Sequence, residues 1–445
     1  MKKFPNTYVI ISTLILLCAV VTWVMPGAKP QTWQVFTALY EGFVRQAGII
    51  VFILIIGGCF WIVNESRAIE NGIRAFRRTC RRLERHALLR RIGMNNIVLA
   101  STMLIFSLFG AVFGMSEETI AFTVVMVPLA ISMGYDSITG VCICFLAALI
   151  GFAGAFLNPF TVGIAQDMAG LPLFSGMGYR LVCWVLLTVV VIVFVLRYAA
   201  KVHRKPQASL MYEADAYWRN LNREGGDERI TGRQTAILSL LGLTIVALIV
   251  GVVFFSWYIA ELSGLFLALG IATGIIMGLS ANDIASNFIA GAKDILSAAM
   301  VIGLASGIIV ILEQGEVLDP MLRAVADTFS HSGKVVTLGV MYALQTLINL
   351  AIPSAAAQAA ITIPIMAPFS DMIGFSRQSM VLAFQFGDGF TNMITPTSGI
   401  LIAVLGIARI PFVTWCRFIW RFLMLSIALG LVLLLATLVL PLPGY

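Results

Sequence analysis

Charged residues are scarce in this 445-residue sequence, and histidines are scarcer still. Asp, Glu, Lys and Arg make up 11% of the chain, whereas 60% is hydrophobic. Soluble domains contain about 25% charged residues, so the composition excludes a water-soluble globular protein and a disordered chain. The three histidines and seven cysteines show no catalytic or zinc-binding pattern. Because a phosphate-binding loop is also lacking, neither an enzyme nor an ATP-driven pump is predicted, and no organic cofactor is expected.

Long apolar segments dominate the chain instead. A helix needs about 20 apolar residues to cross a bilayer, so the sequence predicts an all-α polytopic membrane protein. Several segments are shorter and occur as adjacent pairs separated by Pro, Gly and polar residues, which is typical of re-entrant hairpins and broken helices. The segments are 8–25, 48–64, 95–113, 120–133, 138–157, 180–198, 233–255, 260–279, 297–313, 334–350, 358–370, 377–394, 398–409 and 415–440.

The distribution of Lys and Arg predicts the orientation. All 29 basic residues fall in predicted loops or at segment ends, and 23 of them lie on one side of the membrane, which the positive-inside rule makes cytoplasmic. The N-terminus is then cytoplasmic and the C-terminus outside, with nine crossings and two hairpins. The Arg-rich stretch 67–91 is predicted to be a helix lying on anionic lipid rather than a nucleic-acid patch, so no nucleic-acid partner is expected.

The two halves of the chain resemble each other. Ile62–Phe76 (IVNESRAIENGIRAF) matches Ile311–Val325 (ILEQGEVLDPMLRAV), and further matches follow in the same order. The first copy leads into a strongly basic segment and the second into an acidic one, so the repeats are predicted to be inverted, as in secondary transporters.

The predicted organisation has two repeats and a linking span. The first repeat, 1–232, contains the basic helix 67–91, a hairpin at 95–133, a broken helix at 138–170, a span at 180–198 and a cytoplasmic linker at 199–232. The span 233–255 leads to the second repeat, 256–445, with a hairpin at 334–370, a broken helix at 377–409 and a span at 415–440.

Four interruptions, two per repeat, are predicted to meet near the middle of the membrane and to form the binding site. Asn158-Pro159 and Thr395-Pro396 are each interpreted as a cap residue followed by Pro in the first turn of a half-helix. The interruptions are Ser116, Glu117, Glu118 and Thr119; Asn158, Pro159, Phe160 and Thr161; Ser354 with Gln358; and Asp388, Gly389, Thr391, Asn392, Thr395, Thr397 and Ser398.

Three of these side chains, Glu117, Glu118 and Asp388, are carboxylates predicted at membrane depth, where no Lys or Arg is expected. An unpaired carboxylate there costs several kcal/mol, so a proton, a Na⁺ ion or an ammonium group of the substrate is expected to compensate it. A Na⁺ site is considered near these three residues and Asn392. Half-helix N-termini, Asn158, Asn392 and Thr hydroxyls are expected to hold a substrate carboxylate.

At these residues the chain resembles a known family. Gly114–Val141 (GMSEETIAFTVVMVPLAISMGYDSITGV), Asn158–Ala165 (NPFTVGIA) and Leu382–Pro411 (LAFQFGDGFTNMITPTSGILIAVLGIARIP) are similar to the YfcC group of DcuC-like C4-dicarboxylate carriers in the ion transporter superfamily. The resemblance implies an elevator-type transporter, a homodimer in the bacterial inner membrane, in which a domain with two hairpins moves against a scaffold. It also implies transport of amino acids or dicarboxylates, with basic amino-acid antiport proposed for the YfcC branch.

Carried over by position, the family's ligand regions fall on the interruptions given above. One departure is that Ala355, Ala356 and Ala357 stand where YfcC-like chains have a Gly-Ser-Gly run, which removes a hydroxyl and two flexible positions. The leading hypothesis is an ion-coupled carrier or exchanger of small carboxylate-bearing metabolites. A basic amino-acid antiporter is the alternative, and a passive channel is the weaker one.

Overall fold

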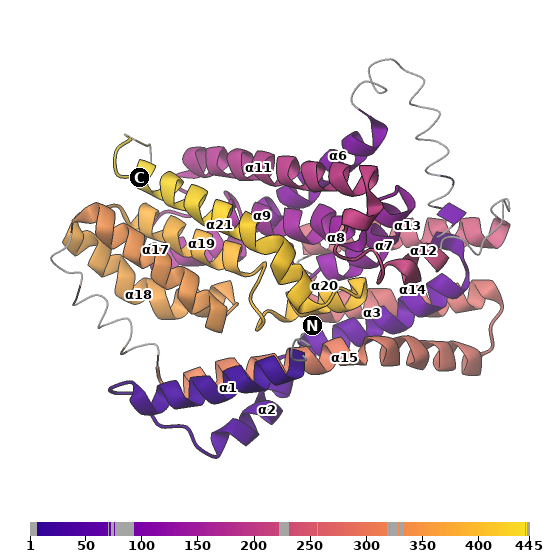
Figure 1. Cartoon of the computed structure of the whole chain (residues 1–445), viewed down its shortest axis with the longest axis horizontal. Helices are drawn as coiled ribbons and strands as arrows, with labels where there is room; N and C mark the ends of the chain where they lie inside the picture. Colours follow the sequence, from indigo (N-terminus) through magenta and orange to yellow (C-terminus); the bar gives the residue numbers. More distant parts are fainter. Residues whose placement is uncertain are drawn as a thin grey trace.

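The computed structural model describes residues 7–69, 71–72, 75, 93–221, 231–255, 257–317, 320, 328, 333–440 and 442. Every regular element within these ranges is a helix, which confirms the all-α prediction for the described part. Most of the predicted basic helix 67–91, residues 222–230 of the predicted linker 199–232, and the C-terminal part of both copies of the repeated motif lie outside the described residues. Most helices run along the long axis of the molecule (Figure 1).

One group of helices surrounds α15 and is called the α15 set. The 34-residue α15 contacts α1, α2 and α3, while α14 packs against α3 and α13 against α14. Glycines allow the close approach of α15 and α3, because a Cβ on Gly57 would lie 2.8 Å from the carbonyl oxygen of Gly291. The members are α1 (Thr7–Val24), α2 (Gln34–Arg45), α3 (Ala47–Glu65), α13 (Gly232–Phe255), α14 (Ile259–Met277) and α15 (Ala281–Gln314).

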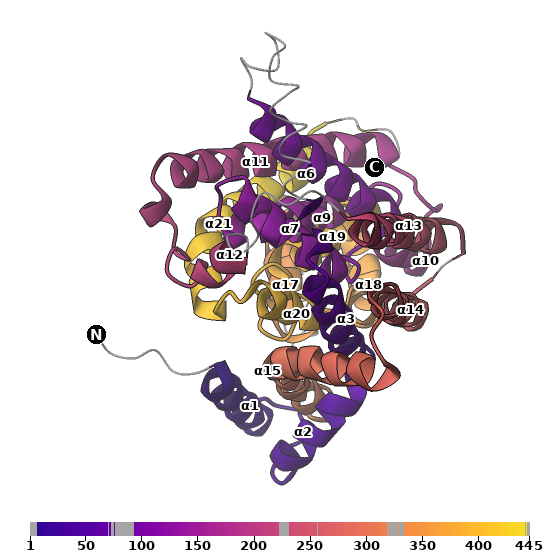
Figure 2. The same ribbon diagram turned by 90° about the vertical axis from the view of Figure 1, so that its right-hand side faces the viewer.

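Most of the remaining helices, long and short, form a second group, called the α19 set, which packs beside the first (Figure 2). Its members are α6 (Met94–Phe113), α7 (Thr119–Ser132), α8 (Ser137–Val141), α9 (Ala147–Ala153), α10 (Ile164–Met168), α11 (Met177–Arg204), α17 (Lys334–Ala351), α18 (Ala355–Ile373), α19 (Arg377–Thr391), α20 (Gly399–Ala408) and α21 (Phe412–Ala436). A π-helical stretch, Cys142–Leu146, joins α8 to α9, and another, Pro159–Gly163, precedes α10. The short α12 (Ala216–Leu221) contacts α7.

The α19 set contains two helical hairpins and two broken helices, in the same order along each half. The pairs α6–α7 and α17–α18 are the hairpins, and they lie toward opposite ends of the molecule (Figure 1). The first broken helix is interrupted at 154–158 and the second at 392–398. Inverted symmetry between the halves stays a prediction that this arrangement favours.

The two broken helices cross where they are interrupted. A Cβ on Gly389 of α19 would lie 2.5 Å from the Cα of Ala153 at the end of α9, so only glycine permits this approach. Beyond the crossing, each second half packs on the other half's hairpin: α10 contacts α18, and α20 contacts α7. Both interruptions and the tip of the first hairpin are therefore brought to the interior of the α19 set, whereas Ser354 at the second tip is exposed.

Three details differ from the sequence prediction. The helix α2 is not predicted because it is amphipathic and therefore lacks a continuous apolar run. The helix α15 begins at Ala281 rather than near 297. The second interruption begins later than expected, because α19 continues to Thr391 and so includes Asp388 and Gly389. The N-cap residue of α20 is Ser398 rather than Thr395, and the Ser398 hydroxyl accepts from the Leu401 N–H.

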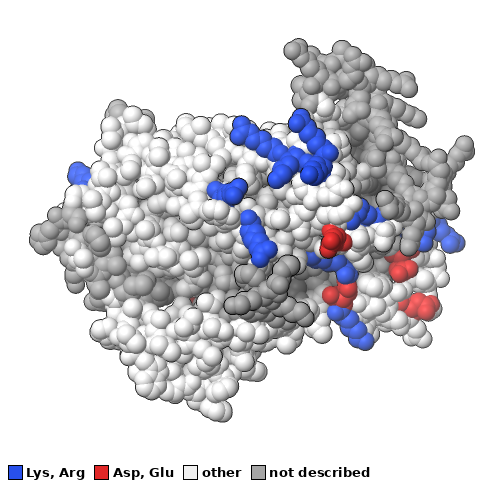
Figure 3. All heavy atoms as spheres, in the orientation of Figure 1, with Lys and Arg blue, Asp and Glu red and all other residues white. Residues whose placement is uncertain are grey.

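By length and composition, seven helices in the described part can each cross a membrane, and the two parts of α15 taken together form an eighth candidate. The seven include α6 and α17, so the first arm of each hairpin is long enough to span by itself. Lys and Arg gather over one half of the face seen in Figure 3, and the other half is almost free of charge. The predicted count of nine crossings stays a prediction.

A buried carboxylate fastens the loop after α11 to the first broken helix. Asp215 Oδ2 accepts from the N–H of Ser137, in the first turn of α8, at 2.9 Å. Burial and the nearby carboxylate of Asp136 raise the pKa of Asp215 from 3.8 to about 6, although hydrogen bonds from Ser137 act in the opposite direction. The charged form of Asp215 is therefore disfavoured in the folded protein.

We predict that Gly389→Ala lowers the stability of the protein by about 1–3 kcal/mol, because the added methyl group overpacks the α9–α19 crossing. The measurement is the melting temperature of the purified protein in detergent. Gly264→Ala on α14 is the control, since nothing lies within 4 Å of a Cβ there. Equal melting temperatures for the two variants would contradict the proposed crossing.

We further predict that stability rises as the pH falls from 8 to 5. The raised pKa of Asp215 means that the folded state binds its proton more tightly than the unfolded chain, so the cost of about 3 kcal/mol at high pH decreases progressively as the pH falls through about 6 toward 3.8. Asp215→Asn should be more stable than the wild type at pH 8 and should show a shallower dependence of melting temperature on pH. The exposed Glu213→Gln in the same loop should keep the wild-type slope.

Candidate functional site

The first hairpin ends in a polar turn beside the first interruption. A Cβ on Gly114 would lie 2.7 Å from Asn158 Oδ1, so the turn and the interruption are in direct contact. In the turn, the Ser116 N–H donates to Glu118 Oε2 at 3.1 Å, and the Ser116 hydroxyl donates to Glu117 rather than capping α7. Glu118 is buried and Glu117 is half-buried. Two carboxylates therefore stand at this tip, as the sequence predicts.

Asn158 caps the helical segment that resumes after the first interruption. Its Oδ1 accepts from the Phe160 N–H at 2.8 Å, which confirms the interpretation of Asn158-Pro159 as a helix start. Its side chain is fully buried, yet Nδ2 has no hydrogen-bond partner among the described residues. The hydroxyl of Thr161 is also fully buried and has no hydrogen-bond partner among the described residues. Cap formation thus leaves a donor and a hydroxyl available at the first interruption.

Asp388 is fully buried in the last turn of α19. Its Oδ1 accepts from Asn392 Nδ2 at 3.1 Å. Asn349, near the end of α17, donates from Nδ2 to the main-chain oxygen of Asp388 at 2.9 Å and to the Thr391 hydroxyl at 2.7 Å. Asp388 Oδ2, Asn392 Oδ1 and Asn349 Oδ1 have no partner in the described part of the chain. The second interruption thus presents three unpaired oxygen atoms.

Unpaired buried polar atoms therefore surround the crossing, and we call them the unpaired cluster. Buried polar groups are nearly always hydrogen-bonded, and each one left unpaired costs about 1–3 kcal/mol, so these atoms are candidates to contact a ligand or a bound water. Oxygen atoms suit Na⁺ or an ammonium group, and the Asn158 amide suits a carboxylate. The cluster consists of Asn158 Nδ2, Thr161 Oγ1, Asn349 Oδ1, Gln358 Oε1, Asp388 Oδ2 and Asn392 Oδ1, counted over the described residues.

Several predicted site residues have structural roles in this conformation. The hydroxyls of Thr391, Thr395 and Thr397 donate to main-chain carbonyls, and Gly389 serves helix packing. Ser354 caps α18 and is exposed, while Ser398 caps α20. The Phe160 side chain is 54% exposed, so only its N–H takes part at the interruption, and Pro159 begins the π-helical turn. The predicted Na⁺ site stays a prediction; within the described ranges, no three His, Cys, Asp or Glu residues group to hold a metal.

Two features of the site were missed from the sequence. Asn349 was overlooked, although its position four residues after Gln345 in an apolar run is a signal that one face of α17 is polar. Arg180 was assigned to a loop, but the structure buries its side chain completely, within the first turn of α11. The expectation that no Lys or Arg lies at membrane depth stays a prediction, because burial inside the protein does not fix the depth of Arg180 in a bilayer.

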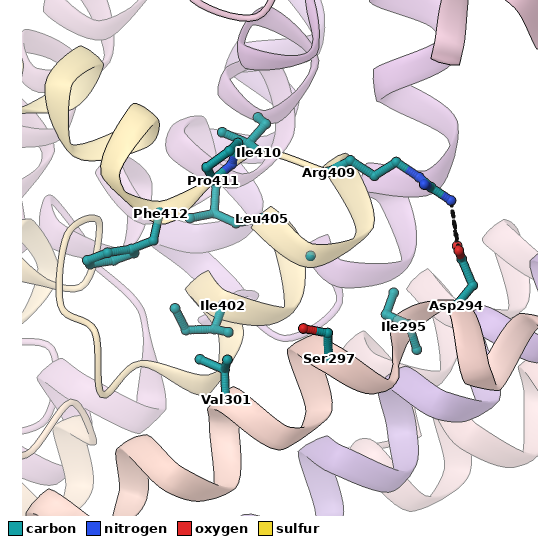
Figure 4. Close-up of a pocket in the computed structure, with 11 residues that line it drawn as sticks. Asp294, Ile295, Ser297, Val301, Ile402, Leu405, Arg409, Ile410, Pro411 and Phe412 are labelled. Carbon is teal, nitrogen blue, oxygen red and sulfur yellow. Dashed lines mark hydrogen bonds and ion pairs between the residues drawn. The ribbon is translucent and has the colours of Figure 1, made fainter. Parts of the chain in front are cut away.

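A separate cavity lies between the two helix sets and does not contain predicted site residues. It has a volume of about 240 Å³ between α15 and the α20–α21 region, and its lining is mostly apolar (Figure 4). At its edge Arg409 of α20 donates to Asp294 of α15, at 2.8 and 2.9 Å. The guanidinium also stacks on the ring of Tyr217 at 3.8 Å. The cavity belongs to the interface between the sets.

Apolar helices of spanning length, together with broken helices that enclose polar atoms, are typical of multi-pass membrane carriers. Comparison with known proteins supports this class. The DcuC family, described as C4-dicarboxylate anaerobic carrier, matches residues 30–439. The chain belongs to the DcuC family, as the resemblance noted from its motifs implies.

The chain is also similar to individual proteins. A protein of Escherichia coli (strain K12) named "Putative basic amino acid antiporter YfcC" is 38% identical over 381 residues, which cover 83% of this chain and 73% of the relative. An uncharacterized protein of Haemophilus influenzae is 29% identical over 425 residues, 92% of this chain and 81% of the relative. The crystal structure of the YdaH transporter of Alcanivorax borkumensis shows 17% identity and a TM-score of 0.42, over 99% of this chain and 100% of that chain.

We predict that Asn349→Leu weakens the second interruption. The substitution removes both buried hydrogen bonds to α19, so the free energy of unfolding should fall by about 1–3 kcal/mol, measured as a lower melting temperature. Thr346→Val, one turn earlier, removes a hydroxyl that bonds only to its own helix and should change stability by less than about 0.5 kcal/mol. A larger effect of Thr346→Val than of Asn349→Leu would contradict the assigned role.

Proposed function

We propose that this protein is a secondary active transporter, an ion-coupled carrier or exchanger of small carboxylate-bearing metabolites across the bacterial inner membrane. The observation that carries the proposal is the unpaired cluster at the crossing of two broken helices. Half-helix N-termini supply free N–H groups for a carboxylate, and half-helix ends supply carbonyls for a cation. A site with both kinds of group suits a substrate and a coupling ion bound together.

The proposed roles follow from the chemistry of each residue. The carboxylates of Glu117, Glu118 and Asp388 would hold a cation, which is a Na⁺ ion, a proton or an ammonium group. Asn158 and Thr161 would contact the substrate, since their unpaired groups lie at the start of a half-helix. The loss of Gly and Ser at Ala355–Ala357 would make the second tip less adaptable than in YfcC-like chains.

An elevator movement of the α19 set against the α15 set is the mechanism that we propose. The side-chain polar contacts that join the sets are few in the described part: the Arg409–Asp294 ion pair, and a hydrogen bond of 3.1 Å from Tyr258 of α14 to Glu117 Oε1. Few specific bonds would have to break for one set to slide past the other. A homodimer formed through the α15 set, with a cytoplasmic N-terminus and an external C-terminus, belongs to the same proposal.

Exchange of basic amino acids is the second candidate. The three site carboxylates favour a cationic substrate, and the relative from Escherichia coli carries that activity in its name. A passive channel is distinguished by flux that does not saturate and shows no exchange. Proteoliposomes loaded with L-arginine, L-aspartate or succinate, assayed with and without a Na⁺ gradient, separate these mechanisms.

We predict that Asp388→Asn abolishes coupled uptake into proteoliposomes, because the neutral amide no longer requires a compensating cation. The variant should still fold in membranes, since Asn392 can bond to an amide oxygen as it does to Asp388 Oδ1. The exposed Glu213→Gln, with the same loss of charge, should transport like the wild type. Unchanged flux in Asp388→Asn would remove this residue from the mechanism.

A further inference from the structure

Arg180 carries a positive charge into the protein interior without a carboxylate to balance it. Its side chain has no exposed surface. The guanidinium donates from Nη1 to Gln385 Oε1 and from Nη2 to Gln378 Oε1, the latter at 3.3 Å. Both partners are neutral amides, and Nε has no partner among the described residues. Removing a charge from water costs free energy unless an opposite charge compensates it, so this arrangement lacks a negatively charged partner for Arg180.

The position of Arg180 connects it to the candidate site. Gln385 also donates from Nε2 to the main-chain oxygen of Ala155 at 2.9 Å, within the first interruption. Asp388 follows Gln385 by three residues on α19, a rise of about 4.5 Å. Gln385, which accepts from this buried cation, therefore lies about one helical turn from the buried Asp388, and in the described structure neither Arg180 nor Asp388 has an ionic partner.

The polar residues of α19 extend this connection along the helix. Gln378, Gln385 and Asn392 follow one another at intervals of seven residues and so share one face, with Asp388 beside them. Gln378 Oε1 also accepts from Gln166 of α10 at 3.1 Å. A continuous line of buried polar groups thus runs from the start of α19 to the second interruption, in helices that are otherwise apolar.

We infer that Arg180 recognises the carboxylate group of the transported substrate, while Asp388 takes its cationic group or the coupling ion. The inference rests on the proposed transport function and specifies the chemistry of its substrate. The two amide oxygens occupy the guanidinium positions that a carboxylate would occupy, so both glutamine side chains would have to move when it binds. A carboxylate would replace neutral hydrogen bonds with charge-assisted ones and would supply the missing negative charge.

A purely structural role makes a different prediction. If Arg180 only fastened α11 to α19, its loss would weaken the binding of all ligands equally. If it recognises a carboxylate, its loss affects only ligands that have one. Paired probes separate these outcomes: L-arginine against agmatine, which lacks the carboxylate, and succinate against succinamide, in which amides replace both carboxylates.

The experiment measures the affinity of the purified full-length protein for each probe by thermal shift and isothermal titration. In the wild type, we expect the carboxylate member of at least one pair to bind roughly ten- to a hundredfold more tightly. Arg180→Gln should reduce that ratio to about twofold or less while leaving affinity for the neutral member unchanged. Arg421→Gln, an exposed arginine whose ring contact is with Trp420, should keep the wild-type ratio.

A second variant protects the test against loss of folding. Gln378→Glu places a carboxylate on Arg180, and the donors Arg180 and Gln166 can both still bond to it. It should raise the melting temperature and remove the preference for carboxylate probes. A wild-type ratio in either folded variant, or a wild type that binds no carboxylate probe more tightly than its neutral partner, overturns the inference. Loss of uptake in the flux assay is judged separately and bears on the transport proposal.

Discussion

The contact on which the rest of the structure depends is the crossing of α9 and α19 at Ala153 and Gly389. There the two broken helices approach within a distance that excludes a second Cβ. Their interruptions therefore meet inside the α19 set, and each second half is directed onto the opposite hairpin. An interrupted helix exposes N–H and carbonyl groups that a bilayer cannot solvate. The crossing places those groups in protein, where a polar ligand can satisfy them.

Much of the fold could be predicted from the sequence, because apolar length and charge placement depend on physics that acts over one segment at a time. The interruptions at Asn158 and near Asp388 were found because Pro, Gly and polar residues break apolar runs. Asn158-Pro159 was interpreted correctly, whereas the same pattern at Thr395-Pro396 was not, because Thr395 bonds back to Thr391 and Ser398 caps the next helix. A cap depends on the turn that precedes it, and two residues do not determine that turn.

The site itself was harder to predict, because burial of a side chain depends on distant partners. Arg180 lies at the start of an apolar run, where an arginine normally reaches water. Only the packing of α11 against its neighbours shows that it faces the glutamines of α19 instead. Asn349 is likewise one polar residue in an apolar helix until α19 is placed beside it. Composition alone does not reveal that Arg180 and Asp388 are both buried in the interior.

The ion pair between Arg409 and Asp294 has a consequence for the speed of the carrier. Both side chains are well over a third exposed, and pairs of this kind contribute only about 0–1 kcal/mol. In the movement proposed above, breaking it would add little to an activation barrier, and re-forming it would return the two helix sets to one register. Ions in the surrounding solution screen such a pair, so turnover and ionic strength become linked through a bond remote from the substrate.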